Sequence, residues 1–211
     1  MNRRLLAVVA IVGLVALSGC ALLTSDTLEF SAQPATVSED AQDSAQYDLV
    51  GVEERTLNRS VDVVGVERQI KATNHVATYE RDLAIATSEA VGSVIVLSTP
   101  EMSVAGQSVN PVGSVPPRQL FETLAIDQAG ISDVEKRGNR TTTVLGEEAT
   151  VTIFDGTAEY SGQEVDVTMH LVRVNHEGDY VVGLAVHPTV MSPDQAGVDQ
   201  MFEGIEHTGD E

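Results

Sequence analysis

The 211-residue sequence has little cysteine, little lysine and no tryptophan. Its single cysteine excludes a disulfide bond within the chain and a cysteine-rich metal site. Of its 12 basic residues only Lys71 and Lys136 are lysines, and 32 acidic residues bring the formal net charge to −20. Nucleic-acid binding needs a basic surface, so this charge balance argues against a nucleic-acid partner.

The acidic excess also indicates the conditions in which the chain folds. Many acids, few lysines and only 4% aromatic residues are together typical of a halophilic protein. Charge repulsion reaches over about 30 Å in 0.01 M salt but only about 3 Å in 1 M salt, so such a surface suits high salt. A disordered acidic chain is the alternative, but 42% hydrophobic residues in regular alternation argue against it.

The N-terminus has the parts of a secretory signal. A head with Arg3 and Arg4 precedes residues 5–17, which are all apolar or glycine. Crossing a membrane takes about 20 apolar residues, so an uncleaved anchor, the alternative, requires the run to continue past Cys20. Residues 17–20, LSGC, resemble a lipobox, in which the cysteine receives lipid and becomes the N-terminus after cleavage.

These features predict three parts: a signal peptide at 1–19, a lipid-anchored tether at 20–26 and a single domain at 27–211. Cys20 is the predicted lipidation site, and the lipid holds the domain on the extracellular face of the cell membrane. The two arginines leave both twin-arginine and general export open. Cleavage removes them and no acid, so the mature side chains carry a net charge of −22.

The rest of the sequence predicts an α+β fold. Runs of β-branched residues are separated by glycine-containing turns such as AGQSV (105–109) and SGQEV (161–165), which is typical of successive antiparallel hairpins. Two main helices are expected to pack on this sheet, one over residues 116–130 and one beginning at 193–194. SEDAQDSAQ (38–46) predicts a further short polar helix.

The C-terminal helix has the clearest buried face. Its apolar residues recur at the spacing i, i+3, i+4 and i+7, which predicts a stripe that packs on the sheet. The stripe consists of Val198, Met201, Phe202 and Ile205.

The last predicted hairpin brings two histidines together. If Glu177 and Gly178 form a two-residue turn, His176 pairs with Asp179 and the apolar residues of both strands share one face. The opposite face then carries His170 and His187 as diagonal neighbours. The candidate metal ligands on this face are His170, His187 and Asp166.

Three interpretations of this histidine face stay open. Imidazole suits zinc and copper, and two neighbouring histidines can also share a proton near neutral pH. The third interpretation is that they are polar residues on a solvated face, or that they cover a packed helix, with no role beyond the fold. The remaining histidines, His75, His176 and His207, form no constellation visible in the sequence.

Other searches give little chemistry. The sequence has no G-x-S-x-G, H-E-x-x-H, P-loop, dinucleotide-binding or EF-hand motif. We therefore predict no catalytic residue and no cofactor, and we interpret the chain as a non-enzyme. Asn58 and Asn139 begin glycosylation sequons, which matter only in an exported chain.

Four segments carry a family resemblance: LSGC (17–20), DTLEFSAQPATVS (26–38), LSTPEMSVAGQSVNPVG (97–113) and VLGEEATVTIFDGTAEYSGQEVDV (144–167). They resemble a family of uncharacterised haloarchaeal lipoproteins, defined as a domain of unknown function. No catalytic or binding residue comes with this resemblance. The pattern of hairpins closed by a C-terminal helix is also similar to the PsbP-like fold, but fold analogy alone does not supply a function.

The sequence thus predicts an exported, lipid-anchored cell-surface protein. Its leading predicted function is that of a non-catalytic binding or accessory module. A surface hydrolase is the alternative, and a metal or small-ligand carrier that uses His170 and His187 is the second alternative.

Overall fold

The computed structural model describes residues 27–63, 65–85, 88–125, 130–160, 162–190 and 195–207. The predicted signal peptide, the tether and Cys20 lie outside these ranges. Within them, none of the helices is long and apolar enough to span a membrane.

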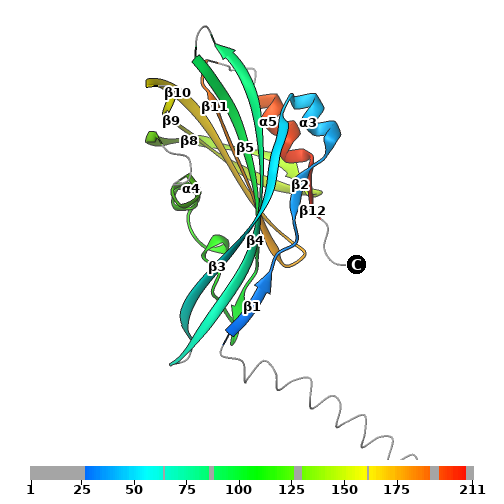
Figure 1. Ribbon diagram of the computed structural model, residues 1–211, viewed down its shortest axis with the longest axis vertical. Coiled ribbons are helices and arrows are strands. Elements are labelled where there is room, and N and C mark those ends of the chain that lie inside the picture. The colour runs from blue at the N-terminus through cyan, green and yellow to red at the C-terminus, as the bar shows by residue number, and fades with distance from the viewer. Residues whose placement is uncertain are drawn as a thin grey trace, which may run out of the picture.

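A strongly twisted eight-stranded sheet forms the body of the molecule (Figure 1). Its order is β1-β4-β5-β11-β10-β9-β8, and β3 pairs along the other side of β4. Neighbouring strands are antiparallel, except that β1 runs parallel to β4. The strands are β1 (Thr27–Ser31), β3 (Asp48–Val63), β4 (Val66–Ile85), β5 (Ser88–Pro100), β8 (Ile131–Val144), β9 (Glu147–Tyr160), β10 (Gln163–His176) and β11 (Asp179–Pro188).

Short elements complete the described fold. Two small ribbons pair β2 with β12 and β6 with β7. Their bounds, with those of the helices, are β2 (Ala35–Val37), β6 (Ser103–Val104), β7 (Gln107–Ser108), β12 (Ile205–His207), α3 (Glu39–Ala45), the 3-10 turn η1 (Pro111–Gly113), α4 (Pro117–Ala125) and α5 (Gln195–Glu203).

Two-residue turns connect the long strands of the sheet. Glu177 and Gly178, between β10 and β11, have φ angles of 51° and 86°. Leu145 and Gly146, between β8 and β9, have φ angles of 52° and 79°. Positive φ at both central residues is the type I′ geometry that matches strand twist. In the predicted AGQSV turn, Ala105 and Gly106 also have positive φ angles, of 50° and 77°. Ser161 of the similar SGQEV turn lies outside the described residues.

Both faces of the sheet are covered. One face packs on α4 and the segment before it, through a cluster that includes Phe121, Phe154 and Met169. The other face packs on α3, α5 and the β2–β12 ribbon, through a cluster that includes Val172 and Phe202. Figure 1 shows α4 on one side of the sheet and α3 with α5 on the other.

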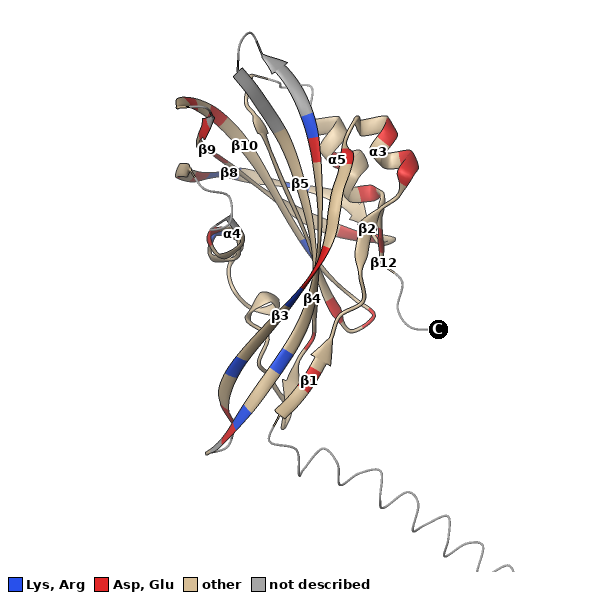
Figure 2. Ribbon diagram, viewed as in Figure 1, with Lys and Arg blue, Asp and Glu red and all other residues tan. Residues whose placement is uncertain are grey.

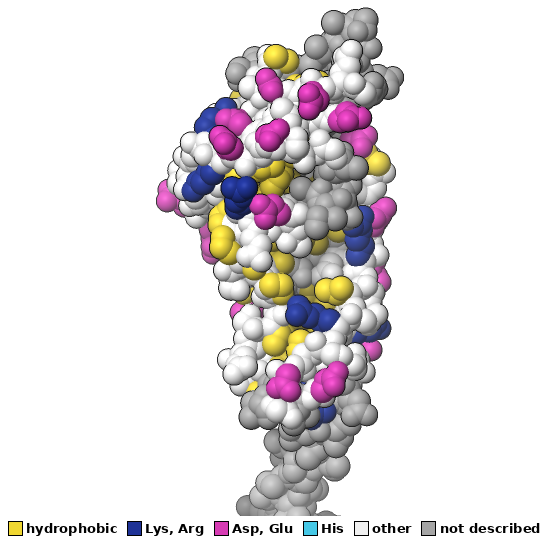
Figure 3. Space-filling view, turned by 90° about the vertical axis from the view of Figure 1, so that its left-hand side faces the viewer, with side chains coloured by type: hydrophobic (Ala, Val, Ile, Leu, Met, Phe, Trp, Pro, Cys, Tyr) yellow, Lys and Arg dark blue, Asp and Glu magenta, His cyan; other side chains and the backbone are white. Residues whose placement is uncertain are grey.

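The surface on the α4 side is mixed in character. Hydrophobic side chains gather across its middle, acidic side chains lie above and below them, and no histidine is visible there (Figure 3). The histidines of the β10–β11 hairpin lie instead toward the α5 side of the sheet.

The helices lie where the sequence predicts them, but they are short. α3, α4 and α5 have seven, nine and nine residues. Val198, Met201 and Phe202 form the buried side of α5, as expected. Ile205 is also buried, but it lies in β12, where it pairs with Val37 of β2. The predicted stripe therefore continues from the helix onto a strand.

The predicted fold class is wrong. We expected an α+β, PsbP-like arrangement with two main helices on an antiparallel sheet. Instead, strands of up to 20 residues dominate the described chain, three small helices accompany them, and the sheet is mixed. The parallel pair arises because β2, α3 and β3 separate β1 from β4, and such a long crossover lets two strands align in the same direction.

Candidate functional site

The register of the β10–β11 hairpin is the one predicted. His176 pairs with Asp179, Met169 pairs with Val186, and Thr168 pairs with His187. His170 and His187 therefore lie diagonally on one face, and their Nε2 atoms are 3.1 Å apart. The two rings are stacked, with an interplanar angle of 18°.

The hydrogen bonds around this pair define its tautomers. His187 Nδ1 lies 3.1 Å from the carbonyl oxygen of Pro188, which only accepts, so this nitrogen carries a proton. In a neutral pair, His187 Nε2 is then the acceptor and His170 Nε2 the donor. His170 Nδ1 is left without a proton, buried and with no hydrogen-bond partner.

Burial keeps His170 neutral. His170 is 1% exposed and His187 is 4% exposed. Burial lowers the pKa of His170 to about 3, with further lowering by His187 and by the nearby Arg140 and Arg137. A cation at this position is therefore unfavourable at neutral pH.

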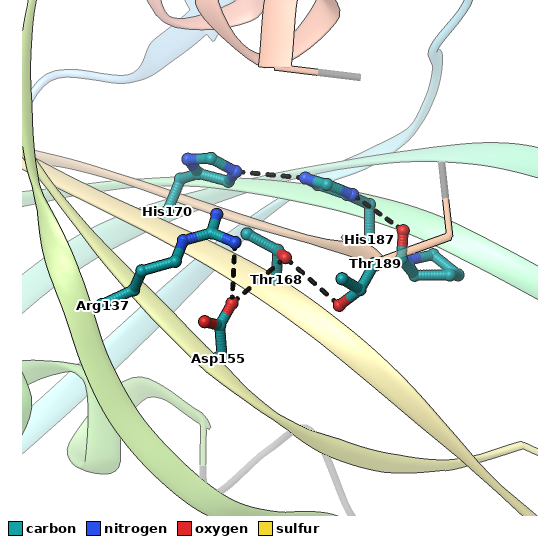
Figure 4. A network of polar contacts seen from close by, with 7 residues as sticks. Arg137, Asp155, Thr168, His170, His187 and Thr189 are labelled. Atoms are coloured by element: carbon teal, nitrogen blue, oxygen red, sulfur yellow. Dashed lines mark hydrogen bonds and ion pairs between the residues drawn. The ribbon is translucent and has the colours of Figure 1, made fainter. Parts of the chain in front are cut away.

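A polar network lies beside the histidine pair (Figure 4). The Thr168 hydroxyl donates to Asp155 Oδ1 over 3.3 Å and lies 3.2 Å from the Thr189 hydroxyl. Asp155 also pairs with Arg137 at 3.1 Å. Thr168 thus links the Arg137–Asp155 ion pair to Thr189.

An ion pair links this side of the sheet to α5. Arg140 of β8 contacts Asp199 of α5, and both side chains are largely buried. Burial lowers the pKa of Arg140 and raises that of Asp199, while their mutual attraction opposes both shifts. The pair fixes α5 against the edge of the sheet near His170.

Asp166 lies apart from the histidines. It is exposed and lines an open hollow of about 320 Å³. Among the described residues, one group of side chains could hold a metal ion, because its ligand atoms lie within 4.8 Å of one another. Asp166 does not belong to that group. The hollow is lined by Asp133, Glu135, Asp155, Gly156, Thr157, Asp166, Val167 and Thr189.

Metal binding by His170, His187 and Asp166 remains a prediction. The structure brings the two imidazoles together, but Arg137 and Arg140 oppose a dication beside them. Calorimetry with zinc or copper on the domain and on a His170→Ala, His187→Ala double variant is the measurement that decides it.

The other predicted positions have different outcomes. Asn58 and Asn139 are exposed and lie on β3 and β8, which are both edge strands of the sheet. Their glycosylation stays a prediction. Cys20 lies outside the described residues.

The outer edge of β3 is a second candidate site. Leu49, Val50, Val52 and Leu57 are 47%, 61%, 44% and 51% exposed, and all four lie on this strand. Among the described residues, Val190 is the other strongly exposed large hydrophobic side chain. The register shifts between Leu49 and Gly51, so that Val50 is the extra residue of a bulge.

Sequence reasoning missed a second histidine pair. His176 Nδ1 and His207 Nδ1 lie 3.0 Å apart, and His207 Nε2 lies 3.1 Å from Asp179 Oδ2. The predicted turn already placed His176 opposite Asp179. The position of His207 had no local signal, because it depends on the pairing of β12 with β2.

The comparisons place the chain in a family without an assigned activity. The chain belongs to the family described as "Domain of unknown function (DUF6517)", which matches residues 34–206. This confirms the part of the sequence resemblance that concerns a domain of unknown function. No curated protein matches the chain.

Two solved structures are distantly similar to it. One is PA94, a protein of unknown function from Pseudomonas aeruginosa, with 7% identity over 66% of this chain and 88% of that one, at a TM-score of 0.31. The other is LpqN of Mycobacterium tuberculosis, involved in cell envelope biogenesis, with 11% identity over 82% and 98%, at a TM-score of 0.36. At this level of similarity neither structure indicates a function for this chain.

Proposed function

We propose that this chain is a lipid-anchored, non-catalytic binding module on the outer face of the cell membrane. In this proposal Cys20 carries the lipid and residues 27–211 form the binding domain. The partner is another membrane-associated protein, which adds an extended segment to the outer edge of β3. The observation that carries the proposal is the concentration of exposed hydrophobic side chains on this one edge strand.

Strand addition suits the chemistry of β3. The strand is 16 residues long and pairs with β4 on one side, so a row of backbone groups lies along its other side. An extended peptide can pair with such a row, and its side chains then meet those of the edge strand. Leu57 and Val52 would provide apolar contacts in such a complex.

The position of β1 favours a partner near the membrane. Ser60 of β3 pairs with Gln69 of β4, which pairs on its other side with Thr27 of β1. Two strand spacings, or about 10 Å, therefore separate β3 from the first residue after the tether. A seven-residue tether from Cys20 reaches at most about 25 Å, so the lipid would hold this part of β3 close to the membrane.

Charge favours a different protein over a second copy. Each mature chain would carry −22 on its side chains, and like charges repel when two copies approach. β3 carries two basic and four acidic side chains, and Figure 2 shows both kinds along the strand.

Photo-crosslinking tests this proposal. A photoreactive residue would replace Leu57 or Val52 in the full chain, in native membranes and molar KCl. The matched control is Thr143, an exposed residue on β8 at the opposite edge. We expect the same heterologous adduct from both β3 positions and none from Thr143. Adding Leu57→Lys to the Val52 probe should weaken its adduct.

Two results would overturn the β3 proposal. An adduct with the mass of two copies would make β3 a self-association edge. Equal labelling from β3 and from Thr143 would show that the contacts are non-specific.

A further inference from the structure

The turn of the β10–β11 hairpin and the end of the described chain meet in one cluster of metal-binding side chains. His176 is the last residue of β10, Glu177 is in the turn, and His207 is the last residue of β12. One ligand atom from each of these three side chains lies within 4.8 Å of the others. This cluster is separate from both the β3 edge and the His170–His187 pair.

We infer that His176, Glu177 and His207 form a binding site for a first-row transition-metal dication of the Zn²⁺ and Cu²⁺ class. Imidazole nitrogens are preferred ligands for these ions, and a carboxylate completes a common three-ligand set. Asp179 is the positioning residue that orients His207.

The hydrogen bond to Asp179 directs the metal-binding nitrogen of His207. A carboxylate oxygen only accepts, so the His207 Nε2 atom, 3.1 Å away, carries the proton. In the neutral ring Nδ1 then has a free electron pair, and it faces His176 Nδ1. Metal-binding histidines in proteins almost always donate their second N–H to a carboxylate, carbonyl or water in this way.

The carboxylate of Asp179 is itself fixed. Its Oδ2 atom also accepts a hydrogen bond of 2.8 Å from the backbone N–H of Gln33. The side chains of Asp179 and His207 are 8% and 0% exposed. Asp179 and His207 are therefore shielded from water. Two separate segments of the chain, at Gln33 and at His207, hold the Asp179 carboxylate in place.

The spacing of the two imidazoles is close to that of a shared metal. Zinc–nitrogen bonds of about 2.0–2.1 Å at a tetrahedral angle separate two ligand nitrogens by about 3.3 Å. The Nδ1 atoms of His176 and His207 are 3.0 Å apart. The His176 ring is partly exposed. A shift of its Nδ1 atom by a few tenths of an ångström would bring the two nitrogens to the separation that a shared zinc ion needs.

The backbone makes this arrangement rigid on one side and accessible on the other. The type I′ turn fixes Glu177 and Gly178, and the Gly178 carbonyl accepts a 2.7 Å hydrogen bond from the N–H of Glu101. Glu177 is exposed and His176 is half-buried, which gives an ion a path from solvent. Three protein ligands leave one tetrahedral position for water or a ligand from outside.

The His170–His187 pair is a weaker candidate for the same ion. His187 Nδ1 donates to a backbone carbonyl, and His170 Nδ1 is buried without a hydrogen-bond partner. Two arginines also lie near the pair. The His176–His207 pair has a carboxylate on each side, from Glu177 and Asp179. Carboxylates attract a dication and arginines repel it, so the two pairs should differ in metal affinity.

Competition between the protein and a chromophoric chelator for Zn²⁺ and Cu²⁺ tests the inference. The full chain is used in molar KCl at neutral pH, and we expect one ion per chain. His176→Ala should lower the affinity at least 100-fold, and Glu177→Gln should lower it to a smaller extent. Asp179→Asn should lower it 10- to 100-fold, as such supporting residues typically do. His75→Ala is the matched control and should leave the affinity unchanged.

A spectroscopic measurement separates ligation from a merely structural effect. Electron paramagnetic resonance of the Cu²⁺ complex should report two imidazole nitrogens in the wild type and one in His176→Ala. The assignment would be overturned in favour of the His170–His187 pair if the His170→Ala, His187→Ala double variant lost metal binding while the His176→Ala variant kept it. Binding weaker than millimolar, or binding unchanged in His176→Ala, would overturn it altogether.

Discussion

Acidification should destabilise this protein through His170. Burial lowers the pKa of His170 to about 3 in the folded chain, whereas an unfolded histidine has a pKa of about 6.5. Between these values the unfolded chain binds the extra proton, so stability rises with pH. The stabilising contribution is complete above pH 6.5 and is lost as the pH falls toward 3.

The size of this effect follows from the pKa difference. Each pH unit in this window changes the free energy of unfolding by about 1.4 kcal/mol. From pH 7.5 to pH 4.5 the loss is therefore about 3 kcal/mol from His170 alone. That is a large share of the 5–15 kcal/mol that typically stabilises a domain.

A non-titrating variant isolates this contribution from the many acids. His170→Gln keeps an N–H donor for His187 but cannot take up a proton. Guanidinium unfolding of both proteins in molar salt, at pH 7.5 and 4.5, gives the difference in stability at each pH. We expect the advantage of the wild type to shrink by about 3 kcal/mol on acidification. An advantage that stays constant or grows would show that His170 is not held neutral by the fold.

Three further predictions concern packing, salt and the anchor. Gly183→Ala should destabilise the domain by about 1–3 kcal/mol, because its Cβ would lie 2.8 Å from Phe202 and 2.9 Å from Val172. Gly138→Ala, which meets nothing within 4 Å, is its control in chemical unfolding, and an equal cost at both glycines would contradict the packing. The melting temperature should rise from tens of millimolar to molar KCl because the net charge is strongly negative; a flat profile would refute this. Cys20→Ser should prevent lipid attachment, and mass spectrometry of the native N-terminus reads the outcome; an unmodified Cys20 within an intact signal would contradict the anchor.

The hairpin was predictable because its rules are local. Side chains alternate along a strand, and a two-residue turn fixes which residues face each other. These two rules were enough to place His170 beside His187. They could not predict that the pair is buried, because the charged groups around it come from β8 and α5. Arg140 pairs with Asp199, 59 positions further along the chain.

The His176–His207 cluster was beyond prediction for a related reason. His207 reaches it because α5 ends at Glu203 and the chain turns into a strand beside β2. From the sequence, the helical stripe extended to Ile205, which would have kept the chain helical past this point. The parallel pairing of β1 with β4 was equally invisible, since it depends on how the chain crosses over through α3.

One histidine pair lies at the middle of β10 and the other at its C-terminal end, and their neighbours give them opposite chemistry. Six residues separate His170 from His176, or about 20 Å along a strand, and effects at such separated sites usually add. Burial and arginines keep His170 uncharged, while carboxylates flank His207 and His176. The increase in melting temperature produced by Zn²⁺ should therefore be the same in His170→Gln as in the wild type. A smaller increase in that variant would mean that the hairpin couples the two pairs, and that the metal inferred at the turn depends on the packing around His170.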